Sequence, residues 1–160
     1  MNFKIGDEVV YPMHGAGIIE DIEEKKILGE LKHYFVLKIP FGDMRILIPV
    51  DSTNEIGVRG IISEVELSPV WQLLAQDPTE MSDNWNRRYR ENMEKLKTGH
   101  VLEVAEVVRN LMITDKEKRL STGERKMLSN AKQILISEIL LVMKIEQQEA
   151  NDMIISAVFG

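Results

Sequence analysis

The sequence contains no cysteine. This absence excludes disulfides, thiolate metal sites and cysteine nucleophiles, and it is typical of proteins of the reducing cytoplasm. No apolar run reaches the roughly 18 residues that a membrane-spanning helix needs. Residues 1–7 also lack the apolar stretch of a signal peptide. We therefore expect a cytoplasmic protein without a membrane partner.

Groups that could carry catalysis are also scarce. The histidines, His14, His33 and His100, have no second histidine or carboxylate at a metal-ligand spacing such as H-E-x-x-H. A G-x-G at residues 15–17 precedes a strand pattern rather than a helix, so it indicates a bend and not a phosphate cradle. Ser121 is explained by helix capping, with no evident base for it. We expect no enzyme, and neither a metal, a cofactor nor a small-molecule substrate.

Charge is distributed unevenly along the 160 residues. The net charge is -6 at pH 7, yet residues 84–132 carry 12 Lys and Arg against 7 Asp and Glu. The segments on either side, 1–83 and 133–160, are acidic. A basic segment between acidic ones is compatible with nucleic-acid binding, which the charge of the whole chain hides. Solvated helix faces are the alternative explanation.

The first 60 residues have the composition of short strands. Runs rich in β-branched and aromatic residues, separated by turn residues such as Gly29 and the 41–43 stretch, occupy residues 8–11, 16–22, 33–39 and 44–50. Residues 23–26 (EEKK) are typical of a solvated hairpin. Several short strands joined by local turns predict a small, strongly bent sheet or an SH3-like β-barrel.

After Gly60 the spacing becomes helical. Ser68 and Pro69 predict a helix start before residues 70–75, and Gly99 ends a helix over residues 84–98. Apolar residues from 101 to 112 follow i, i+3, i+4 spacing, and a capping box at 121–124 begins a helix to about Met143. A last helix covers about 147–158. The chain is predicted to be α+β, with a β domain over 1–60 and an all-helical domain over 61–160.

One constellation combines aromatic and basic residues. Residues 84–90 (NWNRRYR) place two aromatic rings and three arginines within about two helical turns. Arginine forks bind phosphate, and aromatic rings stack on bases or wedge between them. Trp85 also begins a stripe with Tyr89, Met93 and Leu96 that is typical of a core face. Spacing alone favours packing for Trp85 over an exposed position, whereas Arg87 and Arg90 share a face that no core explains.

Four segments follow one another in register along the chain: residues 3–17 (FKIGDEVVYPMHGAG), 84–90 (NWNRRYR), 104–111 (VAEVVRNL) and 120–128 (LSTGERKML). Together they resemble the CarD family of bacterial transcription regulators. The first segment alone is also similar to a module of transcription-repair coupling factors, and the helical half separates the two. The resemblance implies a Tudor-like domain that docks on the β subunit of RNA polymerase and a helical domain that contacts promoter DNA at the upstream edge of the transcription bubble.

The resemblance also implies site residues. Polymerase contacts of the family fall on Lys25 and Leu47, where arginine is typical of relatives, together with the neighbouring Lys26, Ile27, Arg45 and Ile48. The DNA contacts carry over to Trp85, Arg87, Arg90, Arg125, Lys126 and Lys132. We expect a regulator that stabilises the open promoter complex without reading base sequence, because arginines that meet phosphate carry no sequence information. The alternative is a Tudor-like peptide-binding adaptor whose helical domain binds protein.

Overall fold

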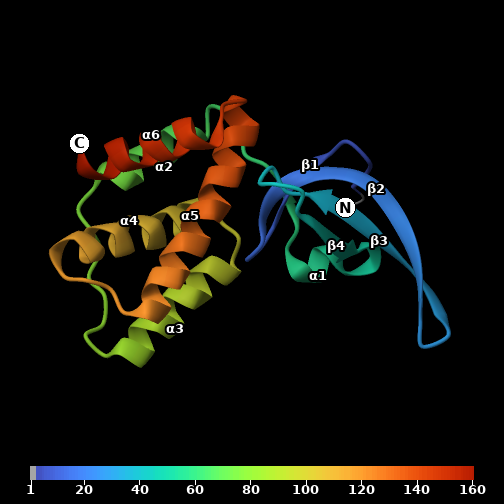
Figure 1. Cartoon of the computed structure of the whole chain (residues 1–160), viewed down its shortest axis with the longest axis horizontal. Coiled ribbons are helices and arrows are strands. Elements are labelled where there is room, and N and C mark those ends of the chain that lie inside the picture. Colours follow the sequence, from blue (N-terminus) through green and yellow to red (C-terminus); the bar gives the residue numbers. More distant parts are fainter. Residues whose placement is uncertain (1–2) are drawn as a thin grey trace.

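A computed structural model describes residues 3–160. Residues 3–60, the sheet region, form an antiparallel sheet with the strand order β4-β3-β2-β1-β5 (Figure 1). Its elements are β1 (Glu8–Tyr11), β2 (Gly15–Ile27), β3 (Glu30–Lys38), β4 (Arg45–Pro49), the short helices η1 (Val50–Ser52) and α1 (Thr53–Ile56), and β5 (Arg59–Gly60).

The sheet buries one face because its apolar residues alternate. Phe35 and Leu37 of β3 pack with Ile48 of β4, Ile19 of β2 and Val9 of β1 in one cluster. The β2–β3 register shifts between Ile19 and Asp21, which marks a β-bulge that bends the long strand. Bending lets one sheet enclose its own small core.

The β2–β3 hairpin extends beyond this core as a two-stranded ribbon (Figure 1). Its residues 22–27 and 30–33 are all exposed. Both strands are longer than the sequence predicts, because the ribbon is solvated on both faces and carries no apolar alternation that would identify it. The α+β class is confirmed, but the sheet is not a closed barrel, since β4 and β5 are separate edges of it.

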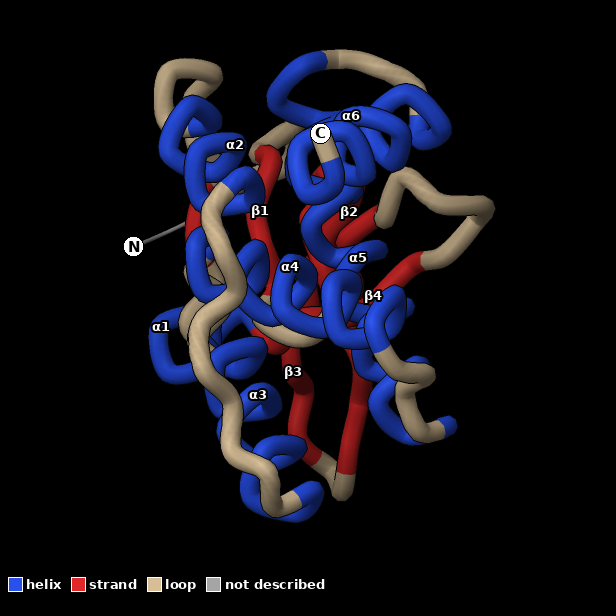
Figure 2. The backbone as a smooth tube through the Cα atoms, turned by 90° about the vertical axis from the view of Figure 1, so that its left-hand side faces the viewer, coloured by secondary structure: helices blue, strands red, loops and turns tan. Residues whose placement is uncertain are grey.

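Residues 61–160, the helical region, bury a second and larger apolar cluster, which includes Val108, Leu111, Leu135 and Ile139. Figure 2 shows its helices in front of the sheet. The helices are α2 (Leu67–Ala75), α3 (Trp85–Lys97), α4 (Val101–Glu117), α5 (Thr122–Met143) and α6 (Gln147–Phe159).

Most predicted helix ends are confirmed by cap geometry. The Ser121 side chain accepts a hydrogen bond from the Glu124 backbone N–H at the start of α5, and Gly99 follows α3 with a φ of 72°. The start predicted at Ser68 is wrong, because α2 begins at Leu67 and Ser68 lies inside it. Pro69 is accommodated there because the N–H groups of a first turn have no helical partner.

Two residues in the middle of α4 bind neighbouring segments to the helical core through hydrogen bonds. The buried Arg109 donates through Nη1 to the Leu73 carbonyl oxygen at 2.9 Å, near the end of α2. The buried Asn110 donates to Thr79 Oγ1 at 2.7 Å and accepts from the Thr79 backbone N–H at 3.1 Å. These two adjacent polar residues therefore hold the segment between α2 and α3 in place.

Candidate nucleic-acid and polymerase surfaces

Trp85 is the first residue of α3 and lies on the surface. Trp85 is 43% exposed, and its ring stacks on the ring of Tyr89 with the two centroids 5.3 Å apart. Its indole N–H donates to Ser121 Oγ at 3.1 Å. Further along the same stripe, Leu96 is 1% exposed. The stripe thus runs from solvent into the core, and Trp85 stands at its exposed end in a fixed orientation.

The first turns of α3 and α5 lie side by side. Asn84 caps α3 by accepting from the Arg87 backbone N–H at 3.0 Å, and Ser121 caps α5. Gly123 lies beneath the aromatic pair, since a Cβ placed there would be 3.5 Å from Trp85 Cζ2. Two helix N-termini, each with a partial positive charge, therefore flank the tryptophan.

A buried ion pair locks these two turns together. Arg88 donates from Nε and Nη2 to the two carboxylate oxygens of Glu124, at 2.8 and 3.0 Å. Glu124 is 2% exposed. Hydrogen bonding to Arg88 holds the pKa of Glu124 below its ordinary value and raises the pKa of Arg88. Sequence reasoning assigned Glu124 to the capping box and missed this partner, which lies 36 residues away.

We expect Glu124→Gln to destabilise the protein by about 3–5 kcal/mol at neutral pH, because it leaves Arg88 buried without a counter-charge. A carboxylate with a lowered folded-state pKa contributes stability above its ordinary pKa, here 4.5, and loses it as pH falls through the folded value. The difference in unfolding free energy between wild type and variant should shrink below pH 4.5. Denaturant titrations at several pH values measure it.

Glu64→Gln is the matched control, because it changes an exposed carboxylate between β5 and α2. Its free energy of unfolding should stay within about 0.5 kcal/mol of the wild-type value. A pH-independent difference for Glu124→Gln would show that the ion pair contributes nothing through ionisation.

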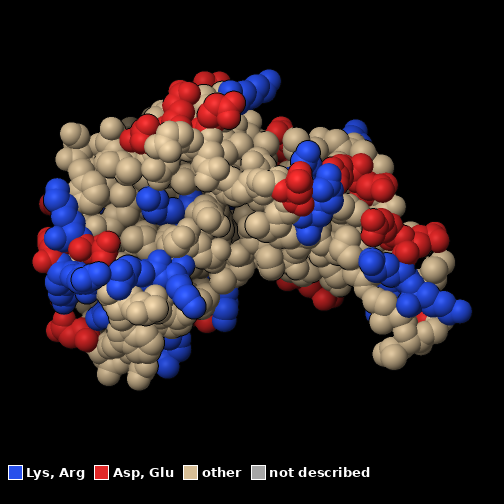
Figure 3. Space-filling view, in the orientation of Figure 1, with Lys and Arg blue, Asp and Glu red and all other residues tan. Residues whose placement is uncertain are grey.

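The predicted basic contacts lie on α3 and α5. Arg87, Arg90, Arg125 and Lys126 are exposed, and Lys132 is half-buried. Arg87 forms an ion pair with Glu91 at 2.8 Å on the same helix, a weak exposed pair that phosphate could replace. In Figure 3, Lys and Arg side chains gather over the lower part of the helical region. The structure therefore gathers basic side chains on two adjacent helices, with Trp85 at the start of one of them.

Two of these basic residues share a groove. Arg125 and Lys132 are seven residues apart on α5, so they project from the same face. They line a groove of about 780 Å³ together with Asp115 of α4 and Gln147 and Asn151 of α6. Gly123 faces Trp85 on α5. Arg125 follows two residues later, about half a helical turn further round, so its side chain points away from the tryptophan. The predicted DNA residues thus form two adjoining groups.

The residues predicted to contact polymerase lie on the opposite end of the molecule. Lys25, Lys26 and Ile27 are exposed at the end of β2, where Ile27 pairs with Glu30 across the turn. Arg45 and Leu47 lie on β4, on the face opposite the core residues Ile46 and Ile48. Arg45 binds the carboxylate of Glu20, the residue at the bulge of β2.

Ile48 is fully buried in the sheet core, so its side chain is not available to a partner. It can take part only through its backbone, because β4 is an edge strand that has no further strand beside it among residues 3–160. Its inclusion as a side-chain contact is therefore corrected. Its side chain instead holds the edge strand on the sheet.

Sequence reasoning missed the apolar tip of the ribbon. Leu28 is 99% exposed, Leu31 is 61% exposed and Ile27 beside them is 41% exposed. Exposed apolar residues gathered at one tip are typical of protein-binding surfaces. The sequence signal for this tip was Leu28 next to Gly29 at the turn between two polar strands. A hairpin that is only solvated would carry polar residues at its turn.

Within residues 3–160, no group of three His, Asp or Glu side chains is placed to hold a metal ion. No helix of this described part is long and apolar enough to cross a membrane.

Comparison with known proteins decides the family. Residues 3–62 match the family model described as the CarD-like/TRCF RID domain, and residues 69–155 match the model of the CarD C-terminal domain. The chain belongs to the CarD family. The second match separates it from the transcription-repair coupling factors, which share the first module by name. It confirms the resemblance found in the sequence.

A curated relative supports the assignment. The chain is 40% identical over 147 residues to a Bacillus subtilis (strain 168) protein named "Putative transcription factor YdeB". The aligned part covers 92% of this chain and 96% of that protein. This CarD-family chain is accordingly a transcription regulator whose N-terminal module is of the type that interacts with RNA polymerase.

Proposed function

We propose that this protein docks on the β subunit of RNA polymerase through residues 1–60 and contacts promoter DNA through residues 61–160. Bound at the upstream edge of the transcription bubble, it stabilises the open complex. The observation that carries the proposal is the exposed Trp85, which is held by Tyr89 and Ser121 beside Arg87 and Arg90. An oriented, solvent-facing ring among cations suits an opened duplex.

The sheet region supplies the protein contact. The outer edge of β4 can pair with a strand of a partner, and side chains then set specificity. The exposed Arg45 and the half-buried Leu47 lie on the face of that strand opposite the core, and Lys25 and Lys26 lie on the ribbon. A charged, apolar-tipped edge of this kind fits a folded protein surface better than a nucleic acid.

The DNA contact is proposed to be independent of sequence. Arg87, Arg90 and Arg125 are long, exposed cations suited to phosphate, which carries no base information. Reading bases would require a helix whose side chains pair with base edges in the major groove. On α3, Arg88 already forms an ion pair with Glu124, so its side chain is not placed to pair with a base edge.

Binding to forked DNA at several salt concentrations tests this proposal. Each phosphate contact contributes about -0.9 to the slope of log affinity against log salt on duplex DNA. We expect Arg87→Ala and Arg125→Ala each to weaken binding and to flatten the slope by roughly one unit, equally on unrelated sequences. Fluorescence anisotropy with labelled forks measures both quantities.

Lys38→Ala, an exposed charge on the sheet region, is the matched control and should leave the slope unchanged. An unchanged slope in both arginine variants would place these side chains away from phosphate. Salt-independent or undetectable DNA binding by the wild type would favour the other reading of the fold, a peptide-binding adaptor. Strong preference for one sequence would overturn the claim of non-specific contact.

A further inference from the structure

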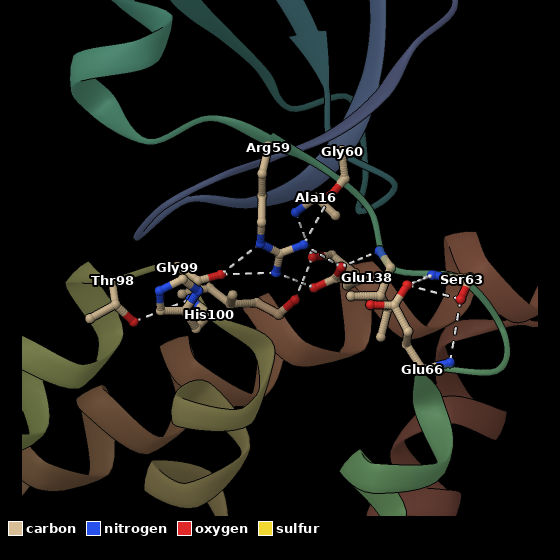
Figure 4. Close-up of polar contacts among 12 residues, drawn as sticks. Ala16, Arg59, Gly60, Ser63, Glu66, Thr98, Gly99, His100 and Glu138 are labelled. Atoms are coloured by element: carbon tan, nitrogen blue, oxygen red, sulfur yellow. Dashed lines mark hydrogen bonds and ion pairs between the residues drawn. The ribbon is translucent and has the colours of Figure 1, made fainter. Parts of the chain in front are cut away.

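The joint between the sheet region and the helical region is built around a single arginine. Arg59 of β5 donates from Nε and Nη2 to the carbonyl oxygen of Gly99, at 3.0 and 2.8 Å. Nη1 and Nη2 also donate to the two carboxylate oxygens of Glu138 on α5, at 2.8 and 2.9 Å. Nη1 further reaches the carbonyl oxygen of Gly60 at 3.0 Å. Figure 4 shows the guanidinium between these groups, with all its N–H donors directed at partners.

The Glu138 carboxylate of this pair also binds the segment between β5 and α2. Glu138 Oε2 also accepts from the Ile62 backbone N–H at 2.9 Å, so one carboxylate holds both β5 and the residue two positions after it. The Glu138 side chain is 5% exposed and that of Arg59 is 26% exposed. This bidentate pair is largely shielded from solvent and fully hydrogen-bonded. It therefore fixes the orientation of the two side chains as well as the distance between them.

Two further contacts lie at other points of the same joint. The Ala16 backbone N–H at the start of β2 donates to Ser137 Oγ at 2.8 Å. Pro12 packs on Gly99, where an added Cβ would lie 2.8 Å from Pro12 Cγ. Contacts from β5, from β2 and from the turn before it therefore meet α5 and the α3–α4 turn. Several separate contacts restrict rotation between the two regions, which one contact would permit.

The polar groups of the joint belong to neither apolar core. The sheet cluster and the helical cluster consist of different buried residues, and the partly buried Phe41 packs against both of them. Arg59 belongs to neither, and Glu138 belongs to the helical cluster's helix without contributing an apolar group to it. Loosening the joint should therefore change how the regions are oriented while each core persists.

We propose that Arg59 and Glu138 are positioning residues, which hold the Trp85 end of the molecule at a fixed reach from the polymerase-docking edge. This inference rests on the proposed function, and it adds that rigidity of the joint is required for it. Two sites joined in a fixed geometry present the second at a high effective concentration, and this advantage is reduced when the geometry is free and must be ordered on binding. Docking and DNA contact would each survive in a loosened protein, but they would reinforce each other less.

The distance between two spin labels tests the joint directly. The chain has no cysteine, so Asp51→Cys and Glu94→Cys, at exposed positions on the sheet region and on α3, introduce the only two thiols. We expect a single narrow distance distribution in the otherwise unchanged protein and a broad one when Arg59→Ala is added. Arg59→Lys keeps the charge but loses the fork, so it should give intermediate width. Circular dichroism checks that both regions stay folded.

The functional arm uses unlabelled protein in three assays. Arg59→Ala should bind isolated polymerase β subunit and forked DNA within about twofold of wild type, yet lose at least about tenfold of any extension of open-complex lifetime, given the avidity of linked sites. Arg59→Lys should recover part of it. A narrow distribution in Arg59→Ala would overturn the rigid joint, and a broad one with full lifetime extension would overturn the positioning role. If wild type itself fails to extend the lifetime, the proposed function fails, and the label distances still decide whether the joint is rigid.

Discussion

The double variant Arg45→Glu with Leu47→Glu is expected to lose all measurable binding to RNA polymerase. Both side chains lie on the sheet face opposite the core, on the edge strand β4, beside the position that a partner strand would take. Arg45→Glu also places a carboxylate beside Glu20, its present ion-pair partner, so the surface changes from balanced to strongly negative. Like charges across an interface cost several kcal/mol, which is enough to abolish a moderate complex. A pull-down with the polymerase β subunit measures the loss.

The helical region should stay folded in this variant, because its apolar cluster contains neither residue. The matched control is Lys97→Glu with Val65→Glu, which makes the same change of charge at two exposed residues of the helical region. The control should bind at the wild-type level. Wild-type recovery by the β4 variant would remove that strand from the docking surface.

Trp85→Ala is expected to shift the open-complex equilibrium by roughly one to two decades while polymerase docking survives. A stacked aromatic contributes about 1–3 kcal/mol per base, and about 1.4 kcal/mol corresponds to tenfold. The fixed position of the ring, stacked on Tyr89 and hydrogen-bonded to Ser121, means that little orientation is lost on binding. Open-complex lifetime on one promoter measures the effect.

The same variant should unfold at a temperature only a few degrees lower. Truncating a fully buried tryptophan costs about 3–5 kcal/mol, but Trp85 is 43% exposed. The variant loses one aromatic pair and one hydrogen bond, each about 1 kcal/mol, together with the partial burial of the ring over Gly123. Trp71→Ala is the matched control, since the other tryptophan packs against the helical core on α2. It should lower the melting temperature more and leave open-complex lifetime nearly unchanged.

A collapse of the melting temperature in Trp85→Ala would restore the core role that its stripe spacing allows. A normal melt with a normal open-complex lifetime would leave Trp85 with neither role.

The local parts of the fold could be predicted from the sequence because their causes are local. The capping box at Ser121 and the glycine after α3 act within one helical turn, and both ends are confirmed. The start of α2 was wrong because Ser68 and Pro69 satisfy the pattern of a first turn whether they precede it or lie inside it. The open sheet could not be distinguished from a barrel, because closure depends on whether β4 and β5 meet.

The contacts that organise the candidate surfaces were beyond sequence reasoning for the same reason. Arg88 and Glu124 are 36 residues apart, and Arg59 and Glu138 are 79 apart. Neither helical nor strand periodicity indicates which turns meet across such distances. For Trp85, the spacing favoured a core stripe, and only the family resemblance favoured an exposed ring at the helix start. Only the packing of α3 against α5 shows that the ring lies at the exposed end.

The central claim is that one molecule holds polymerase and opened DNA together, and the lifetime of the open complex at a single promoter tests it most directly. The lifetime is measured by competitor challenge without protein, with wild type, with Trp85→Ala and with the Arg45→Glu, Leu47→Glu variant. We expect wild type to lengthen the lifetime and each variant to return it toward the value without protein. An unchanged lifetime with saturating wild-type protein bound to polymerase would contradict the central claim.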